Sequence, residues 1–438
     1  MSKLGTVLKN STLKKEILGG LTTFFTMSYI IFIQPLILHQ VGMDKGAVMV
    51  ATCISSAIAM IFMAVLANYP FALAPAMGHN FYFVYGVCLA LGVSWQIALG
   101  ANFIAGVIFI LLSFWGLREK VINAVPYSLK NAICVGIGLL ITLIGLEWSG
   151  IIKANPNTFV TLGDIKSKPA LISIFGLLLI AFLITKRAKG AILIGILSNL
   201  AIAIFSGMVK FEGIIGKIPS LSSTFLKLNI LEALKINMWS IIFVFLFLDL
   251  FDTVGTLIGL AEQANFLKEG KLPRARCALF SDAVGTVTGT LLGTSTITTY
   301  IESSTGIAEG ARTGIANLVT AFMFLLSLIF YPLIKMVSAP VKLEGFNTYP
   351  IIAPALIVVG WFMISNIRKI NWDDFSESFP AFVTLITIPL TFSITEGISF
   401  GFITYTFLKL IKGEIKNVSS LVSIFSLLFL LRYIFLFK

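Results

Sequence analysis

Apolar stretches long enough to cross a lipid bilayer recur along almost the whole of this chain. Each runs for about 15–24 residues, close to the length that a helix needs to cross about 30 Å of hydrocarbon. Of the 438 residues, 57% are apolar and 12% are charged, whereas a soluble domain carries about 25% charged residues. The sequence therefore predicts an all-α polytopic membrane protein. It excludes a soluble enzyme, a nucleic-acid-binding protein and a secreted disulfide scaffold.

The apolar segments predict about fourteen spans. They lie near residues 17–40, 47–67, 73–90, 94–116, 128–149, 170–185, 190–208, 238–261, 274–292, 294–307, 314–336, 348–367, 378–393 and 396–411. Basic residues are more frequent in the connections that share a side with the N-terminus, which favours a cytoplasmic N-terminus. The apolar C-terminal tail, 413–438, contains a stretch at 418–437 that is long enough for a further span. The sequence leaves the role of this stretch open.

The order of the spans suggests an internal duplication. Residues 1–208 would form a first repeat of seven spans and residues 238–412 a second, joined by the loop 209–237. The third span of each half is short and interrupted by helix-breaking or polar residues. An odd number of spans in each half would invert one half relative to the other, and matching broken spans are typical of transporter binding sites at mid-membrane depth.

Three carboxylates fall inside predicted spans. Asp249 and Asp252 lie three residues apart in the eighth span, on one helical face, and Thr256 follows one turn later. Glu302 lies in the tenth span among serines and threonines, just before an expected half-helix whose amides would face a bound polar group. Placing a charge at the bilayer centre costs about 2.5–3.5 kcal/mol, so carboxylates inside spans indicate a specific role. The carboxylates either form a binding site or are enclosed by hydroxyls and amides of a neighbouring helix.

The third span contains residues that should break its helix and free polar groups. Pro75 and Gly78 interrupt it, and Asn80 offers one acceptor and two donors for a ligand with mixed hydrogen-bonding edges. His79 is one of two histidines, and we expect it to pack or to lie at an interface rather than to relay protons. Asp282, in the ninth span, is expected to be a structural partner for a donor on the cytoplasmic side.

The sequence contains no nucleotide-binding, metal-binding or catalytic motif that we can recognise. It has no Walker A loop and no HExxH pair, and its four cysteines are scattered. We therefore expect no enzyme activity, no cofactor and no metal site. Transport would be driven by an ion gradient or by the gradient of the substrate itself.

Several segments carry a family resemblance. They are APAMGHNFYF at 74–83, WQIALGANFIAGVIFILLS at 95–113, FLDLFDTVGTLIGLAE at 247–262 and the long run at 271–314. Through them the chain resembles the AzgA-like permeases of adenine, guanine and hypoxanthine, the purine branch of the nucleobase–ascorbate transporter superfamily. The likeness covers nearly the whole chain, from 16–30 to 388–403.

The resemblance implies a fold like that of bacterial uracil permease. Spans 1–4 and 8–11 would form a core domain and spans 5–7 and 12–14 a gate domain, with a short strand in spans 3 and 10. It also implies a multi-pass protein of the cell (inner) membrane that imports purine nucleobases by proton symport and alternating access. A homodimer is compatible with this resemblance, and no nucleic acid is expected as a partner.

The resemblance also implies roles for individual residues. Glu302 matches the glutamate that bonds the base in span 10, and Asn80 matches the asparagine of span 3. Asp249 and Asp252 match the two aspartates of span 8, and which of them contacts the ligand stays open. Thr256 falls where the uracil branch has a histidine.

Two further expectations concern the base and the proton. Aromatic side chains such as Phe24 and Phe81 would lie against the faces of the purine, and Asp252 or Glu302 would carry the proton. The segment AMGHN departs from the family pattern at Ala76 and His79, where the family more often has Gly or Leu-like residues. This difference bears on substrate preference rather than on the class of transporter.

Two other functions remain open at this stage. Sulfate and bicarbonate carriers share the expected fold, but they would favour cationic residues at the site and usually carry a cytoplasmic C-terminal domain. An ion channel could also use acidic residues in broken spans, although the sequence has no pore signature. An intramembrane enzyme ranks last.

Overall fold

The computed structural model describes residues 12–115, 125–235, 238–267, 272–343, 345–414, 416 and 418–435. Among these residues, eight helices are long and apolar enough to cross a membrane. They are Leu13–His39, Lys45–Ala67, Trp95–Ser113, Tyr127–Trp148, Lys168–Thr185, Trp239–Gln263, Gly314–Val337 and Ile394–Ile411. Of the other predicted spans, 274–292 contains an unbroken helix of 18 residues, Ala275–Leu292, and the rest contain shorter or broken helices. The chain is an integral multi-pass membrane protein, as its composition predicts.

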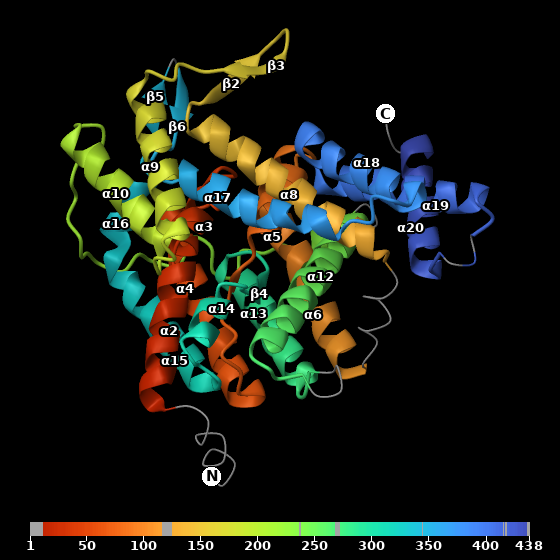
Figure 1. The fold of residues 1–438 in the computed structure, drawn as a ribbon, viewed down its shortest axis with the longest axis horizontal. Helices are drawn as coiled ribbons and strands as arrows, with labels where there is room; N and C mark the ends of the chain where they lie inside the picture. Colours follow the sequence, from red (N-terminus) through yellow and green to blue (C-terminus); the bar gives the residue numbers. More distant parts are fainter. Residues whose placement is uncertain are drawn as a thin grey trace.

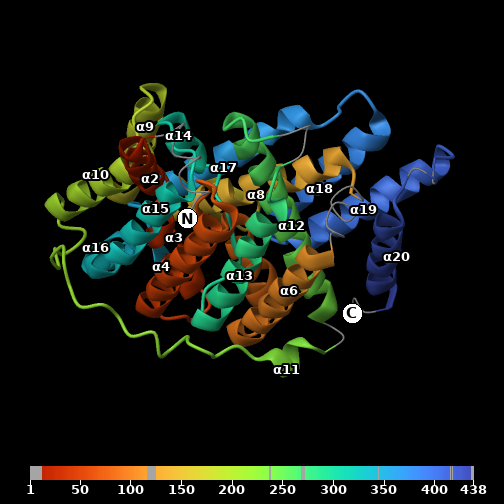
Figure 2. The same ribbon diagram turned by 90° about the horizontal axis from the view of Figure 1, so that it is seen from below.

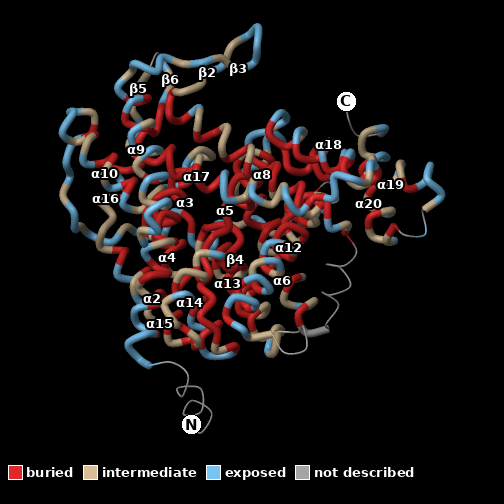
Figure 3. Tube along the Cα trace, viewed as in Figure 1, coloured by how far each residue is buried: buried red, intermediate tan, exposed pale blue. Residues whose placement is uncertain are grey.

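The helices form two bundles that lie side by side (Figures 1 and 2). The α12 bundle consists of α2 (Leu13–Met27), α3 (Ile30–His39), α4 (Lys45–Phe62), α5 (Met77–Phe81), α6 (Trp95–Trp115), α12 (Trp239–Gln263), α13 (Ala275–Leu292), α14 (Ser303–Ala308) and α15 (Gly314–Leu326). The α8 bundle consists of α8 (Tyr127–Trp148), α9 (Lys168–Thr185), α10 (Ala191–Phe205), α17 (Ala353–Ile364), α18 (Phe375–Thr391) and α19 (Ile394–Ile411). Buried residues run through both bundles (Figure 3).

Shorter elements extend or connect these helices. They include π-helical turns at Met63–Ala67 and Tyr82–Leu89, 3-10 turns at Ser327–Phe330 and Ser365–Lys369, α11 (Ile230–Ala233) and α16 (Tyr331–Val337). The hairpins β2 (Ile152–Asn155)–β3 (Phe159–Leu162) and β5 (Val341–Leu343)–β6 (Phe346–Thr348) lie at the end of the molecule opposite the start of α2 (Figure 1). The segment between α10 and α12 runs along one side of the molecule (Figure 2).

Glycines allow the helices of each bundle to approach closely. A Cβ on Gly306 of α14 would lie 2.5 Å from the carbonyl oxygen of Gly19 on α2. In the other bundle, a Cβ on Gly360 of α17 would lie 2.6 Å from the carbonyl oxygen of Gly138 on α8. Any larger residue would push these helices apart, and small residues at such contacts are typical of membrane helix packing.

Two short strands meet inside the α12 bundle, where the third and tenth spans are broken. β1 (Leu73–Pro75) pairs antiparallel with β4 (Ile297–Thr299), and each strand leads into a short helix, α5 or α14. This pairing satisfies backbone groups that hydrocarbon could not. The Thr286 hydroxyl of α13 forms hydrogen bonds with the other edge of β4. It accepts from the Ile297 N–H at 3.1 Å and donates to the Ile297 carbonyl oxygen at 3.0 Å.

The C-terminal tail contains a helix, α20 (Ser420–Phe435), that contacts both bundles. The Arg432 guanidinium pairs with the Glu396 carboxylate of α19 at 2.9 Å. The Phe425 ring stacks on the Phe243 ring of α12, with centroids 3.4 Å apart. The apolar stretch predicted in the tail is therefore helical and packed against the rest of the chain.

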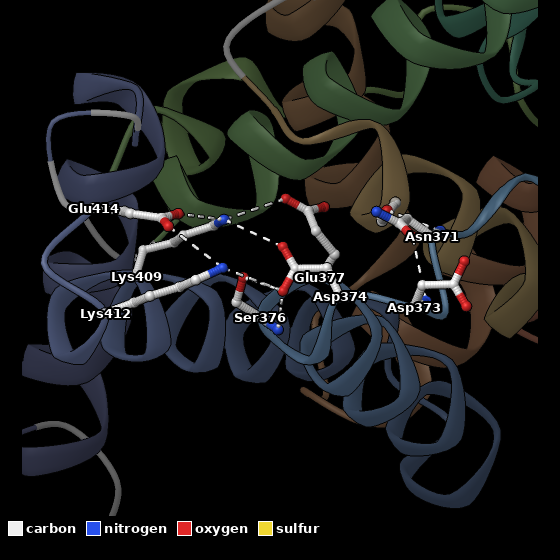
Figure 4. Close-up of polar contacts among 9 residues, drawn as sticks. Asn371, Asp373, Asp374, Ser376, Glu377, Lys409, Lys412 and Glu414 are labelled. Carbon is white, nitrogen blue, oxygen red and sulfur yellow. Dashed lines mark hydrogen bonds and ion pairs between the residues drawn. The ribbon is translucent and has the colours of Figure 1, made fainter.

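An ion cluster joins the start of α18 to the end of α19 (Figure 4). Lys409 Nζ lies 3.0 Å from the Glu414 carboxylate and 3.8 Å from the carboxylates of Asp374 and Glu377. Lys412 lies 3.5 Å from Asp374 and 3.3 Å from Glu414. The two lysines thus hold together three carboxylates at one edge of the α8 bundle.

Candidate substrate-binding site

A narrow cleft lies between the α12 and α8 bundles. It is lined by Gly78, His79, Phe247, Leu248 and Asp252 of the α12 bundle and by Lys130, Ile133, Cys134, Ile137 and Met363 of the α8 bundle. Its cavity volume is about 30 Å³, well below the volumes typical of small-molecule sites. The two walls therefore stand close together and must separate to admit an organic ligand.

Asp252 is the carboxylate that lines this cleft. It lies in the middle of α12 and is solvent-accessible, in contrast to its neighbour Thr253, which is fully buried. The Thr298 hydroxyl of β4 lies 3.5 Å from Asp252 Oδ2, at the outer limit of a hydrogen bond. Glu302 is close enough for its charge to interact with that of Asp252. The broken tenth span thus brings its own polar groups to the carboxylate of the eighth span.

Glu302 is held by a tyrosine from the first span. Helix α2 ends at Met27 and α3 begins at Ile30, and Tyr29 lies in the break between them. Its hydroxyl donates to Glu302 Oε1 at 2.6 Å, a short distance that is typical of a charge-assisted bond. Glu302 immediately precedes α14, as the sequence predicts. Sequence reasoning missed Tyr29, because a tyrosine in an apolar span carries no signal of its partner.

Asp249 and Asp282 form an enclosed pair that does not line the cleft. Asp249 is 2% exposed and Asp282 is 0% exposed. The Thr253 hydroxyl lies 3.3 Å from Asp249 Oδ1 and 3.0 Å from both oxygens of Asp282. Thr286 lies 3.5 Å from Asp249, and Thr299 lies 3.5 Å from Asp282. Asp249 therefore has the hydroxyl partners that the sequence left open as an alternative, and Asp282 bonds inside the bundle.

Asn80 lies behind the cleft wall, where it is fully buried. Its Oδ1 accepts a hydrogen bond from the Ser295 hydroxyl. Gln34 Nε2 of α3 donates to the same hydroxyl at 3.1 Å and to that of Thr294 at 2.8 Å. Asn80 Nδ2 has no hydrogen-bond partner within the described part of the chain. Two carboxamides thus hold the segment that precedes β4.

Glu302 and three other predicted site residues, Phe24, Phe81 and Thr256, are not among the residues that line the cleft. Phe24 packs edge-on against Phe324, with ring centroids 5.6 Å apart. Phe81 stacks on Tyr85 at 5.8 Å and is fully buried. Thr256 lies one turn beyond the cleft-lining part of α12. Of the predicted site residues, Asp252 therefore lines the cleft, and the charge of Glu302 interacts with it.

The cleft also contains polar residues outside the predicted site. Lys130 is in the first turn of α8, and Cys134 follows one turn later. His79 is buried and lines the cleft, and it therefore does not lie at a membrane interface. The signal in the sequence that distinguishes His79 is its departure from the family pattern.

Residues 14–400 match the model of the Permease family (Xan_ur_permease). The chain belongs to this family. Guanine/hypoxanthine permease PbuG of Bacillus subtilis is 44% identical over 446 residues, which cover 99% of this chain and 98% of PbuG. Adenine permease AdeP of Escherichia coli is 40% identical over 427 residues, which cover 97% of this chain and 94% of AdeP. The chain is therefore a transporter with purine nucleobase permeases as homologues, and it is not an enzyme.

Solved structures of other transporters have the same fold as this chain. The transmembrane domain of the cyanobacterial bicarbonate transporter BicA has a TM-score of 0.64 at 16% identity, and the match covers 89% of the permease and 97% of that domain. The murine anion transporter Slc26a9 has a TM-score of 0.67 at 11% identity, covering 91% of the permease and 68% of Slc26a9. At these identities the likeness concerns the fold alone.

Proposed function

We propose that this permease carries purine nucleobases, namely hypoxanthine, adenine or guanine, across the membrane. The observation that carries the proposal is the position of Asp252, a carboxylate in the middle of a membrane-spanning helix that faces a cleft between two helix bundles. The names of the homologues PbuG and AdeP support the substrate class.

The chemistry of a purine suits this site. The base presents N–H donors beside bare ring nitrogens and carbonyl oxygens, and a carboxylate accepts from N–H donors. Asp252 and Glu302 would accept from the base, while the Tyr29 hydroxyl holds Glu302 in position. Once its walls enclose the base, a site of this kind rejects analogues that lack a matching group, because its own polar groups are then left unpaired.

Alternating access would move the α12 bundle, as the core domain, against the α8 bundle, as the gate domain. The cleft lies between them and is too narrow for a planar base until its walls separate. Fourteen spans in two inverted repeats, 1–208 and 238–412, would supply the two bundles. The antiparallel pairing of β1 with β4 supports this inverted arrangement.

We further propose that import is coupled to protons, with Asp252 or Glu302 as the carrier and the N-terminus in the cytoplasm. One charge crossing 100 mV gains about 2.3 kcal/mol, and one pH unit adds about 1.4 kcal/mol. Together they support roughly 500-fold accumulation for one proton per purine. Facilitated diffusion would give no accumulation of the purine.

Uptake of labelled hypoxanthine tests the coupling. In proteoliposomes with an imposed proton gradient, we expect accumulation that a protonophore abolishes. Uptake that only equilibrates hypoxanthine, equally with and without the imposed proton gradient, would refute the proton coupling. Inhibition by adenine and guanine but not by uracil or bicarbonate is expected, whereas inhibition by bicarbonate alone would favour an anion carrier.

Cys134 offers a test of the site that does not depend on transport. It lines the cleft, whereas the other partly exposed cysteine, Cys277, is not among the lining residues. In a Cys277→Ser variant, we expect hypoxanthine to slow the alkylation of Cys134 by N-ethylmaleimide. In the matched Cys134→Ser variant, hypoxanthine should leave the alkylation of Cys277 unchanged. Equal rates at Cys134 with and without hypoxanthine would contradict the location of the site.

A further inference from the structure

His79 is a polar side chain of the cleft whose hydrogen bonding is incomplete. It is 2% exposed, and within the described residues neither Nδ1 nor Nε2 has a hydrogen-bond partner. The chain's other histidine, His39, behaves differently, because its Nδ1 lies 2.9 Å from the Met43 carbonyl oxygen. Buried polar groups are normally paired, and leaving one unpaired costs free energy. The ring of His79 therefore has hydrogen-bonding capacity that a bound molecule can use.

The position of His79 places this capacity at the boundary between the two bundles. A Cβ on its neighbour Gly78 would lie 3.3 Å from Ile137 Cγ2 of α8, so α5 and α8 approach each other closely here. Both His79 and Asp252 belong to the wall formed by the α12 bundle. A ligand that enters as the walls separate would meet both side chains.

The two side chains offer different hydrogen-bonding chemistry. An ionised carboxylate such as Asp252 can only accept, whereas a neutral imidazole offers one N–H donor and one bare nitrogen. A purine carries N–H groups, which suit a carboxylate, and bare ring nitrogens, which need a donor. Lys130 also lines the cleft, but it belongs to the opposite wall, in the first turn of α8. The donor on the same wall as Asp252 is the imidazole.

We propose that His79 donates a hydrogen bond from its ring to a bare ring nitrogen of the purine, so that the binding affinity depends on the presence of this nitrogen. The inference rests on the proposed transport of purines and adds a specificity-determining residue to it. It assigns a recognition role to a residue at which this chain departs from the family pattern.

Deaza analogues of hypoxanthine, in which one ring nitrogen is replaced by CH, test this contact. Binding of labelled hypoxanthine to the purified full chain is competed with the 1-, 3-, 7- and 9-deaza bases. For the wild type, we expect the analogue that lacks the bare nitrogen bound by His79 to bind about tenfold more weakly than hypoxanthine, as for one lost hydrogen bond. In His79→Leu, this tenfold difference should fall to about one, while the penalties at the other positions stay unchanged.

Controls separate this inference from the proposed function. His79→Phe keeps an aromatic ring without nitrogens and should lose the same discrimination, so it provides the test if the Leu variant is not recovered in folded form. His39→Leu should keep the wild-type pattern. A wild type that binds no purine would refute the proposed function. A wild type that binds purines, with every deaza penalty preserved in the His79 variants, would overturn the role of His79 alone.

Discussion

The α12 bundle contains two sets of carboxylates in different surroundings, because Asp252 faces the cleft whereas Asp249 and Asp282 are enclosed by the bundle. Asp252 faces the cleft and has one hydroxyl at 3.5 Å. Asp249, three residues earlier on the same helix, is enclosed with Asp282 and shares the Thr253 hydroxyl with it. Strand β4 lies between the two sets, with the side chain of Thr298 near Asp252 and the next residue, Thr299, near Asp282. Neighbouring residues of a strand point to opposite faces, which explains this division.

The comparison indicates which acidic residues are available for a ligand. Asp249 and Asp282 accept hydrogen bonds from threonines of the bundle itself, so their bonding contributes to the folded state. The Thr253 hydroxyl has one proton and can donate to only one of these carboxylates at a time. Asp252 has little such support and is therefore the group that a substrate can bind. The first two predictions test this division.

The largest effect is expected at the cleft. Asp252→Asn removes a charged acceptor for the base and, under the proposed coupling, a proton carrier. We expect hypoxanthine uptake to fall about 100-fold, as for a lost bond to a charged group, with the protein still monodisperse in detergent. Glu302→Gln should behave similarly. Asp373→Asn, at an exposed carboxylate outside the cleft, is the control and should transport normally. Normal uptake by both site variants would mean that the site is misplaced.

The enclosed pair should respond in stability. Thr253→Val keeps the shape of the side chain and removes the hydroxyl shared by Asp249 and Asp282. We expect the free energy of unfolding to fall by about 1–3 kcal/mol, since buried carboxylates lose a donor, and thermal unfolding in detergent to begin at a lower temperature. Thr298→Val is the matched control, and its effect should be on uptake more than on stability. The opposite pattern would reverse the assignment of the two sets.

The sequence predicted more of the fold than of the site. Hydropathy located the helices, and Pro75, Gly78 and the polar run before Glu302 located the two broken spans. The sequence could not decide between Asp249 and Asp252, because a three-residue spacing puts both on one broad helical face. That choice depends on where β4 and α13 pack, and long-range packing leaves no trace in a local pattern.

The residues that complete the site illustrate the same limit. Tyr29 becomes a partner of Glu302 because the first span breaks next to the tenth, 273 positions apart in the chain. Lys130 and Cys134 line the cleft because α8 lies against α5. Each of these residues is ordinary in its own segment, and only the packing of the two bundles brings it to the cleft.

A third group of carboxylates, at the surface, should give the smallest effect. Two hydrogen bonds from Ser376, one from its backbone N–H and one from its hydroxyl, hold the pKa of Asp374 below its usual value, and Lys412 and Lys409 add to this. The Lys409 hydrogen bond likewise lowers the pKa of Glu414. Since these values are lower in the folded protein, their stabilisation is present at neutral pH and is lost as the pH falls below about 4.

Asp374→Asn tests this third environment, because it keeps a side chain that can cap α18 and removes only the charge. We expect a slightly lower melting temperature at pH 7, a smaller difference in high salt, and a difference that shrinks as the pH falls below about 4 and the wild-type carboxyl takes up its proton. Uptake should be unchanged at neutral pH, because the cluster of Figure 4 lies outside the cleft. A loss of uptake as large as that of Asp252→Asn would instead show that a surface carboxylate acts in transport. The distinction between cleft, enclosed and surface carboxylates would then fail.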